Sequence, residues 1–76
     1  MKDKSIEYYR KKNNLSQQKL AELLNTTQTN ISFIEQKKMY PDIETAEKIA
    51  NILGVTIGAL WNEYELDMML EKSNRR

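Results

Sequence analysis

The sequence predicts an all-α fold, with five short helices in one compact domain and a C-terminal helical extension. Three observations predict it. Apolar residues recur at spacings of three and four along most of the chain, which is the period of a helix with one buried face. Residues that favour the start of a helix, such as Ser, Thr and Asp, precede these segments. No segment of the sequence has the alternating pattern of a β-strand.

Composition limits both the fold and the chemistry. The 76 residues suffice for one small domain, and the absence of Cys and His excludes disulfide bridges and the usual zinc sites. No apolar run reaches transmembrane length, and the N-terminal segment lacks the apolar core of a signal peptide. We therefore expect a cytoplasmic protein without a membrane partner.

The net charge of +1 conceals an asymmetry along the chain. Residues 1–40 hold eight Lys and Arg against four Asp and Glu, whereas residues 41–76 hold four against seven. A basic half followed by an acidic half suits a protein that offers one face to a polyanion. The alternative is a solvated surface of mixed charge without a partner.

The first predicted helix spans about residues 6–13. Asp3 and Ser5 precede it, and either is a suitable N-cap because its side-chain oxygen accepts a hydrogen bond from a free N–H group of the first turn. The helical spacing turns Ile6 towards the core and leaves Arg10 on the flank of the buried face.

Residues 15–36 are predicted to form two short helices separated by a tight turn. Ser16 is a suitable N-cap for the first of them. Ala21 is small at a position where a crossing helix would come close. The residues expected on its inward face follow helical spacing, and they are Leu20, Leu23 and Leu24.

The turn and the second helix of this pair follow without extra residues. Asn25 interrupts the apolar pattern, and Asn tolerates the left-handed backbone with which many helices end. Thr26 or Thr27 then caps the second helix, whose inward residues are Ile31 and Ile34. Two short helices joined at a steep angle by a tight turn form a helix-turn-helix arrangement.

Further helices are predicted after a loop at residues 36–41. Asp42 is a good N-cap for a helix over residues 43–53, and Gly54 is suited to end it. A short fifth helix is expected over residues 57–61, although its glycine weakens it by about 1 kcal/mol relative to alanine.

The last segment, residues 62–72, also has helical spacing, and residues 73–76 are expected to form a frayed polar tail. We therefore divide the chain into a domain over residues 1–61 and a C-terminal extension over residues 62–76. The extension carries a short apolar stripe among acidic residues, which consists of Leu66, Met69 and Leu70.

The order of residue types in the helix pair resembles the XRE family, which includes the lambda and 434 repressors and Cro. The resemblance extends from about Ile6 to Trp61 and implies a compact, repressor-like DNA-binding domain. The family usually has Gly where this chain has Asn25, a departure that leaves the turn feasible. The matching positions are Gln17, Ala21, Asn25, Thr27, Gln28, Ile31, Ile34 and Glu35.

Under this resemblance the second helix of the pair, at about residues 28–36, is the recognition helix that enters the major groove. A step of 100° per residue from Ile31 points Thr29, Ser32, Phe33 and Gln36 away from the core. The resemblance implies that four residues face base edges, namely Gln28, Thr29, Ser32 and Phe33. A Gln amide pairs with adenine, and an aromatic ring contacts the methyl group of thymine.

The resemblance also implies contacts with the DNA backbone and one structural ion pair. Gln17 matches a position that holds a phosphate, at a helix start that offers backbone donors to the same anion. Arg10 and Glu35 match positions that form an ion pair between the first and third helices. The other residues expected to contact phosphates are Thr27, Asn30, Gln36, Lys37, Lys38 and Tyr40.

We therefore expect a transcriptional regulator, acting as a repressor, that binds double-stranded DNA as a homodimer on a palindromic operator. The apolar stripe of the extension is expected to support dimerisation, with an interface formed by Trp61, Tyr64, Leu66, Met69 and Leu70. Folding of the extension back onto its own domain is the alternative. We expect no cofactor and no small-molecule ligand.

An enzyme is disfavoured because the sequence has no His, no Cys and no glycine-rich phosphate loop. The competing functional class is a small helical module that binds another protein, such as an adaptor or an antitoxin. Salt dependence distinguishes the two classes, because DNA binding weakens steeply as the salt concentration rises.

Overall fold

Short helices connected by tight turns make up the computed structural model, which describes residues 5–74 and the side chains of residues 5–72. Every regular element in these residues is a helix, so the all-α prediction is confirmed. The helices are α1 (Ile6–Lys12), α2 (Gln17–Leu23), α3 (Gln28–Glu35), α4 (Ile43–Leu53), α5 (Ile57–Leu60) and α6 (Glu63–Asn74).

Helix starts lie where the capping residues predict them. In each of the first four helices, a side-chain oxygen accepts a hydrogen bond from the backbone N–H three residues later, at 2.9–3.3 Å. The capping residues are Ser5, Ser16, Thr27 and Asp42. Asp3, the alternative cap for α1, lies outside the described residues. These bonds satisfy N–H groups that have no partner within the helix.

The left-handed helix ends are also confirmed. Asn25 follows α2 with a φ of 57°, and Gly54 follows α4 with a φ of 75°. Asn14 has a similar backbone, with a φ of 59°, after α1. Asn and Gly are the residues that adopt this conformation most readily, so each turn has the residue that its backbone requires.

Several helix boundaries differ from the prediction by one or two residues. Helix α1 ends at Lys12, one residue early, and α5 ends at Leu60, because Trp61 has an extended backbone with a φ of −132°. Helix α6 runs through Asn74, so residues 73 and 74, which were predicted to belong to a frayed tail, are helical. The last two residues of that tail lie outside the described residues.

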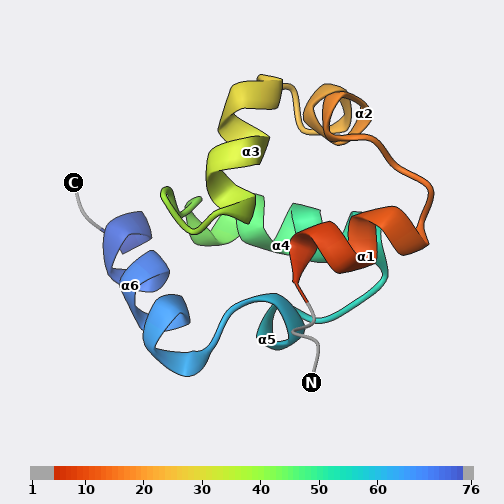
Figure 1. The fold of residues 1–76 in the computed structure, drawn as a ribbon. Helices are drawn as coiled ribbons and strands as arrows, with labels where there is room; N and C mark the ends of the chain where they lie inside the picture. Colours follow the sequence, from red (N-terminus) through yellow and green to blue (C-terminus); the bar gives the residue numbers. More distant parts are fainter. Residues whose placement is uncertain (1–4, 75–76) are drawn as a thin grey trace.

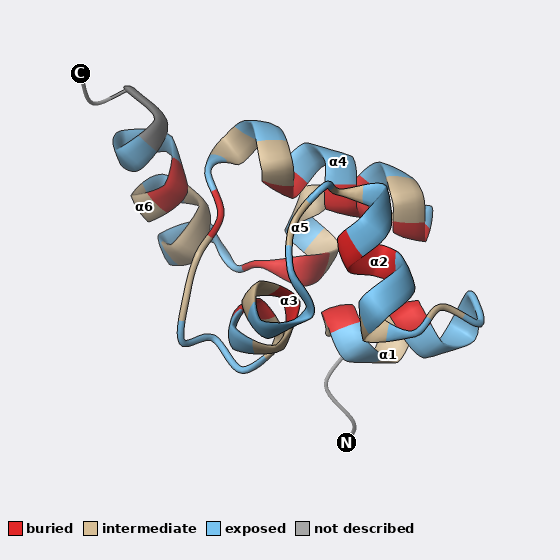
Figure 2. Ribbon diagram, turned by 90° about the horizontal axis from the view of Figure 1, so that it is seen from above, coloured by how far each residue is buried: buried red, intermediate tan, exposed pale blue. Residues whose placement is uncertain are grey.

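Helix α4 is the central element of the molecule. It contacts α1, α5 and α6, whereas α2 and α3 contact each other, as expected for the helix pair. Figure 1 shows α2 and α3 together at one end of the molecule and α6 at its opposite side. Buried residues lie on the inward sides of the helices (Figure 2), and the largest of them are Trp61, Leu20, Ile31, Ile49 and Met69.

The prediction that Leu23 faces the core is wrong, since its side chain is 51% exposed. Helix α2 packs through Leu20 and Ala21, which are buried, and Leu24 is partly buried against the same core. Leu23 lies about 100° around the helix from Leu24, which turns it off the narrow contact face of this short helix. None of the described helices has the length and apolar character needed to cross a membrane.

Candidate nucleic-acid interface

Helix α3 has one buried side and one exposed side. Ile31 and Ile34 are buried in the core. The opposite side presents Gln28 and Thr29 to solvent, and the ring of Phe33 is 41% exposed. Ser32 lies on the same side and is half-buried. The four residues expected to face bases are therefore all at least partly accessible on α3.

The N-terminal end of α3 is held in place by local hydrogen bonds. Thr27 caps the helix through the backbone N–H of Asn30, at 3.1 Å. The Asn30 side-chain amide donates to the hydroxyl of Thr26, at 2.8 Å. Farther along, the Gln36 amide donates to Ser32 Oγ, at 2.7 Å. These bonds connect the turn to α3. They also mean that Asn30 and Gln36, which were expected to contact phosphates, already make side-chain hydrogen bonds within the protein.

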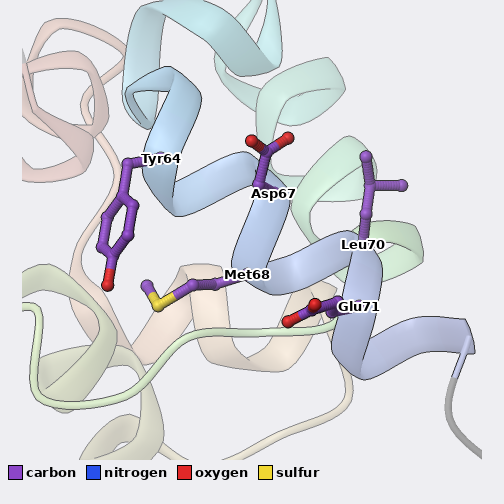
Figure 3. A pocket seen from close by; sticks show the side chains of 5 residues that line it. All are labelled: Tyr64, Asp67, Met68, Leu70 and Glu71. Carbon is purple, nitrogen blue, oxygen red and sulfur yellow. The ribbon is translucent and has the colours of Figure 1, made fainter.

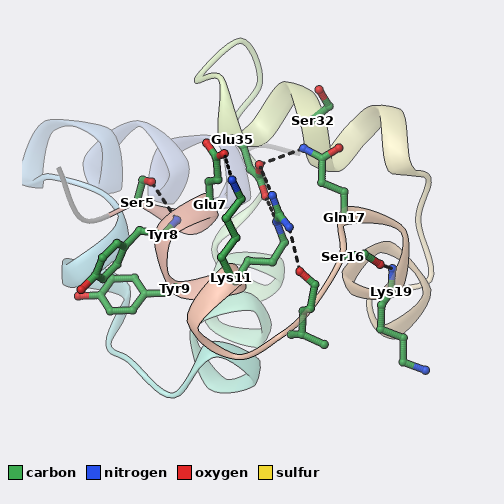
Figure 4. Close-up of polar contacts among 12 residues, drawn as sticks. Ser5, Glu7, Tyr8, Tyr9, Lys11, Ser16, Gln17, Lys19, Ser32 and Glu35 are labelled. Carbon is green, nitrogen blue, oxygen red and sulfur yellow. Dashed lines mark hydrogen bonds and ion pairs between the residues drawn. The ribbon is translucent and has the colours of Figure 1, made fainter. Parts of the chain in front are cut away.

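A buried ion pair connects α1 to the end of α3, as the resemblance implies. Arg10 Nε donates to Glu35 Oε2 at 2.6 Å, and Arg10 Nη2 donates to Glu35 Oε1 at 3.3 Å (Figure 4). The exposed fractions of the two side chains are 8% and 6%. Arg10 Nη1 also donates to the backbone oxygen of Leu15, at 2.8 Å. Arg10 is therefore buried, whereas the helical spacing predicted it on the flank of the buried face.

This ion pair continues towards the N-terminal end of α3. Gln17 Nε2 donates to Glu35 Oε1 at 3.0 Å, and Gln28 Nε2 donates to Gln17 Oε1 at 3.4 Å. Four polar side chains thereby form a chain from α1 to the first residue of α3. Sequence reasoning identified each residue but missed these connections, because spacing along the chain does not show which side chains of different helices meet.

The loop at residues 36–41 is bound to α6 through Glu65. Lys37 Nζ donates to Glu65 Oε1 at 3.1 Å, and the Tyr40 hydroxyl donates to Glu65 Oε2 at 2.8 Å. Lys38 is exposed. Two of the residues expected to contact phosphates, Lys37 and Tyr40, therefore already bond to a carboxylate within the protein.

These contacts change the ionisation of Glu65 and Tyr40. Burial raises the pKa of Glu65, but hydrogen bonds from Asn62, Tyr40 and Lys37, together with the charge of Lys37, outweigh it and leave the pKa below its ordinary value. The hydrogen bond to Glu65 raises the pKa of Tyr40, and burial and the carboxylate charge add to this. Near neutral pH, a carboxylate therefore faces a protonated phenol.

The interface expected for a dimer is only partly available. Trp61 and Met69 are buried in the core of the domain itself, so neither can meet a second subunit, and their assignment to an interface is wrong. Helix α6 packs on α4 through this side, which is why the stripe is covered. Leu66 is half-buried against the same core.

Other side chains of α6 remain accessible on its outer face. Tyr64 is 72% exposed and Leu70 is 46% exposed. With Asp67, Met68 and Glu71 they line a hollow of about 550 Å³ (Figure 3). Among the described residues, no group of three or more His, Cys, Asp or Glu gathers as metal ligands.

The chain is similar in sequence to known helix-turn-helix proteins. The model of the helix-turn-helix family matches residues 6–60. The chain is 36% identical over 73 residues to the HTH-type transcriptional activator BcrR of Enterococcus faecalis, covering 96% of this chain and 36% of that protein. It is also 36% identical over 62 residues to the HTH-type transcriptional regulator PuuR of Escherichia coli, covering 82% of this chain and 34% of that protein.

A third relative is closer to this chain in length. It is an uncharacterized HTH-type transcriptional regulator of Methanocaldococcus jannaschii, 42% identical over 57 residues, which cover 75% of this chain and 85% of that protein. By contrast, the chain spans only about a third of the length of BcrR and PuuR. The matched segment contains α2 and α3 together with the buried ion pair.

Proposed function

Because this chain belongs to the helix-turn-helix family, we propose that it binds double-stranded DNA in a sequence-specific way and regulates transcription. The observation that carries this proposal is the outward side of α3. It presents polar side chains and one aromatic ring on a helix that is capped by Thr27 at its start and held by the buried ion pair at its end. A rigid helix of this kind enters the major groove with its N-terminal residues foremost.

Base recognition is assigned to Gln28, Thr29, Ser32 and Phe33. The amide of Gln28 suits adenine, because it pairs with the N6 donor and the N7 acceptor together. Its hydrogen bond to Gln17 orients that amide before DNA arrives, which reduces the entropy lost on binding. Phe33 offers an apolar surface to the methyl group of thymine.

Contacts with phosphates are assigned to the residues around the two ends of the helix pair. The phosphate role proposed here leaves out Lys37 and Tyr40, because Glu65 neutralises the charge of Lys37 and accepts the single hydroxyl hydrogen of Tyr40. Since the ligand is DNA, the proposal places the protein in the cytoplasm. The residues that take the phosphate role are Gln17, Thr27, Asn30, Gln36 and Lys38.

We further propose a homodimer on a palindromic operator, acting as a repressor. A single domain of this size covers one half-site, and two-fold dimers of such domains read two. Tyr64 and Leu70 are the apolar side chains of α6 that remain accessible for a second subunit, with Leu66 at the edge. Occupation of an operator that overlaps a promoter is sufficient for repression.

The test is selection of duplexes from a random-sequence pool, followed by affinity measurements at several salt concentrations. Wild type should select a two-fold symmetric sequence and lose affinity steeply as salt rises. Gln28→Ala should lose discrimination at one base pair by about 1–3 kcal/mol. The control is Gln18→Ala, which removes another exposed glutamine, from α2. A module that binds only proteins would select no sequence.

A further inference from the structure

Lys37 has a backbone conformation that its residue type disfavours. Among the described residues other than glycine, positive φ angles occur at Asn14, Asn25 and Lys37, the last at 64°. Asn tolerates this left-handed conformation, whereas the Cβ atom of a residue such as Lys is crowded in it. Strain of this kind persists only where the surrounding structure holds the residue in place, and such positions cluster at functional sites.

The backbone of Lys37 ends the recognition helix. Its N–H donates to the oxygen of Ile34 at 3.1 Å, and the N–H of Lys38 donates to the oxygen of Phe33 at 2.9 Å. This pair of bonds is the Schellman motif, in which glycine usually occupies the position held here by Lys37. The conformation of this one residue therefore sets the direction of the loop at residues 36–41 as it leaves α3.

The side chain of Lys37 connects the end of α3 to the end of α5 and to the first turn of α6. Its ammonium donates to the oxygen of Leu60, the last residue of α5, at 3.2 Å, and to Glu65 at 3.1 Å. The same nitrogen lies 5.9 Å from the ring centre of Tyr40 and 6.0 Å from that of Trp61, within the range of a cation–π contact. Lys rather than Gly at this position thus provides contacts that a glycine cannot make.

Glu65, in the first turn of α6, is the residue that Lys37 contacts there. It accepts from the Asn62 N–H at 2.9 Å, while its own N–H donates to Asn62 Oδ1 at 2.8 Å, so the two residues form a capping box at the start of α6. Its other oxygen accepts from Tyr40, and its side chain is only 13% exposed. Figure 1 shows the loop between α3 and α4 facing α6.

We propose that Glu65 is a positioning residue for DNA binding: acting through Lys37 and Tyr40, it holds the end of α3 and the following loop against α6. The inference rests on the proposed function, since Ser32 and Phe33 stand in the last turns of the same helix. Displacement of that helix end moves base-reading side chains and Lys38 together. By reciprocity, bound DNA stabilises the packing of α6.

The test compares Glu65→Ala with Glu63→Ala. Both substitutions remove one negative charge from the first turn of α6, but Glu63 is exposed to solvent. The probe is a duplex selected from a random pool by the wild-type protein. Glu65→Ala should bind it about tenfold more weakly than Glu63→Ala, a factor typical of coupled sites. In the absence of DNA, the backbone amide hydrogen of Lys38 should exchange faster in Glu65→Ala than in the wild type, and Glu63→Ala should exchange it at the wild-type rate.

A double-mutant cycle separates positioning from a general structural role. In a Lys37→Met background, Glu65→Ala should weaken DNA binding by clearly less than tenfold, because the contact through which it acts is already lost. An undiminished loss in that background overturns the inference. If Glu65→Ala does not fold, Glu65→Gln replaces it, since Gln keeps the shape and one acceptor but loses the ion pair.

Two further outcomes overturn the inference. One is equal affinity of Glu65→Ala and Glu63→Ala for the selected duplex. The other is tighter binding by Glu65→Ala with a steeper salt dependence, which would mean that Glu65 competes with a phosphate for Lys37. If wild type selects no sequence, the proposed function fails as well, whereas failure in the variants alone leaves that function standing.

Discussion

Arg10 and Glu35 carry opposite charges that are almost completely withdrawn from water, with exposed fractions of 8% and 6%. Each charge depends on the other, because removal of one partner strands a buried charge. Arg10→Ala should therefore lower the free energy of unfolding by about 3–5 kcal/mol. Urea denaturation monitored by circular dichroism measures this quantity.

The matched control for this prediction is Lys11→Ala. Lys11 pairs with Glu7 at 2.9 Å, but both side chains are more than half exposed. Exposed pairs of this kind contribute below about 1 kcal/mol, because water and salt screen them. Equal denaturation midpoints for the two variants would show that the buried pair is not what holds α1 to α3.

Phe33 is predicted to select thymine at one position in each half-site. Its ring is 41% exposed on the outward side of α3, so core packing explains little of its presence. Phe33→Ala should keep nearly the wild-type stability and bind the cognate site about 1–3 kcal/mol more weakly, with a flattened preference at that base pair. Binding titrations against single-base variants of the selected duplex measure both effects.

Uracil provides the control for this contact. Replacement of that thymine by uracil removes only the 5-methyl group. Wild type should bind the uracil duplex more weakly, whereas Phe33→Ala should bind both duplexes alike. Equal affinity of wild type for uracil and thymine at every half-site position would mean that Phe33 does not contact a base.

Helix α6 is predicted to be an integral part of the domain. Met69 is fully buried where α6 packs on α4. Met69→Ala should therefore lower the free energy of unfolding by about 2–5 kcal/mol, the usual effect of a cavity in a core. Met68→Ala, on the half-buried neighbour, is the control. If thermal denaturation shows that both variants lose a similar amount of stability, the buried contact of Met69 is not what holds α6 on α4.

The start of α4 should respond to acid. Hydrogen bonds from Thr45 hold the pKa of Asp42 below its ordinary value, against an opposing effect of burial, and Lys72 and Lys48 lower it further. A pKa lowered in the folded state contributes stability that is present above the unfolded pKa, near 3.9, and is lost as the pH falls through the folded pKa. Stability should therefore decrease below about pH 4.

Asp42→Asn isolates this contribution. Asn caps helices about as well as Asp, so the variant should keep the cap at neutral pH but lose the part of the acid dependence that Asp42 supplies. Denaturation series at several pH values measure the slope for wild type and variant. Identical slopes down to acid pH would assign the acid dependence to other carboxylates.

For the proposed dimer, salt should have opposite effects on the proposed subunit interface and on DNA binding. The outer face of α6 places Asp67 and Glu71 beside the exposed Tyr64 and Leu70, so a two-fold copy would meet like charges. A rise from about 0.05 to about 0.5 M salt screens that repulsion and should tighten the dimer. The same rise should weaken DNA binding, since it opposes counterion release.

Sedimentation equilibrium measures the dimer, and titration of the selected duplex measures DNA binding. Leu70→Glu adds a charge to the outer face and should shift the protein towards monomer at all salt concentrations. A dimer that is unaffected by this substitution would use another surface.

The sequence by itself determined the helices and the surface that α3 exposes. Caps at Ser16, Thr27 and Asp42, and the left-handed Asn25 and Gly54, act within a few residues. Such local interactions can be identified from residue type and spacing alone. The helical period also predicted that Ile31 turns inward and Phe33 outward.

Tertiary structure alone decided which side chains of distant elements meet. Leu23 is exposed because α2 contacts its neighbours through a narrow face, and Met69 is buried where α6 folds back on α4. The contacts from Gln28 through Gln17 to Glu35, and from Lys37 to Glu65, join residues 11 to 28 positions apart. Period and capping cannot predict them, because they depend on the crossing angles of packed helices.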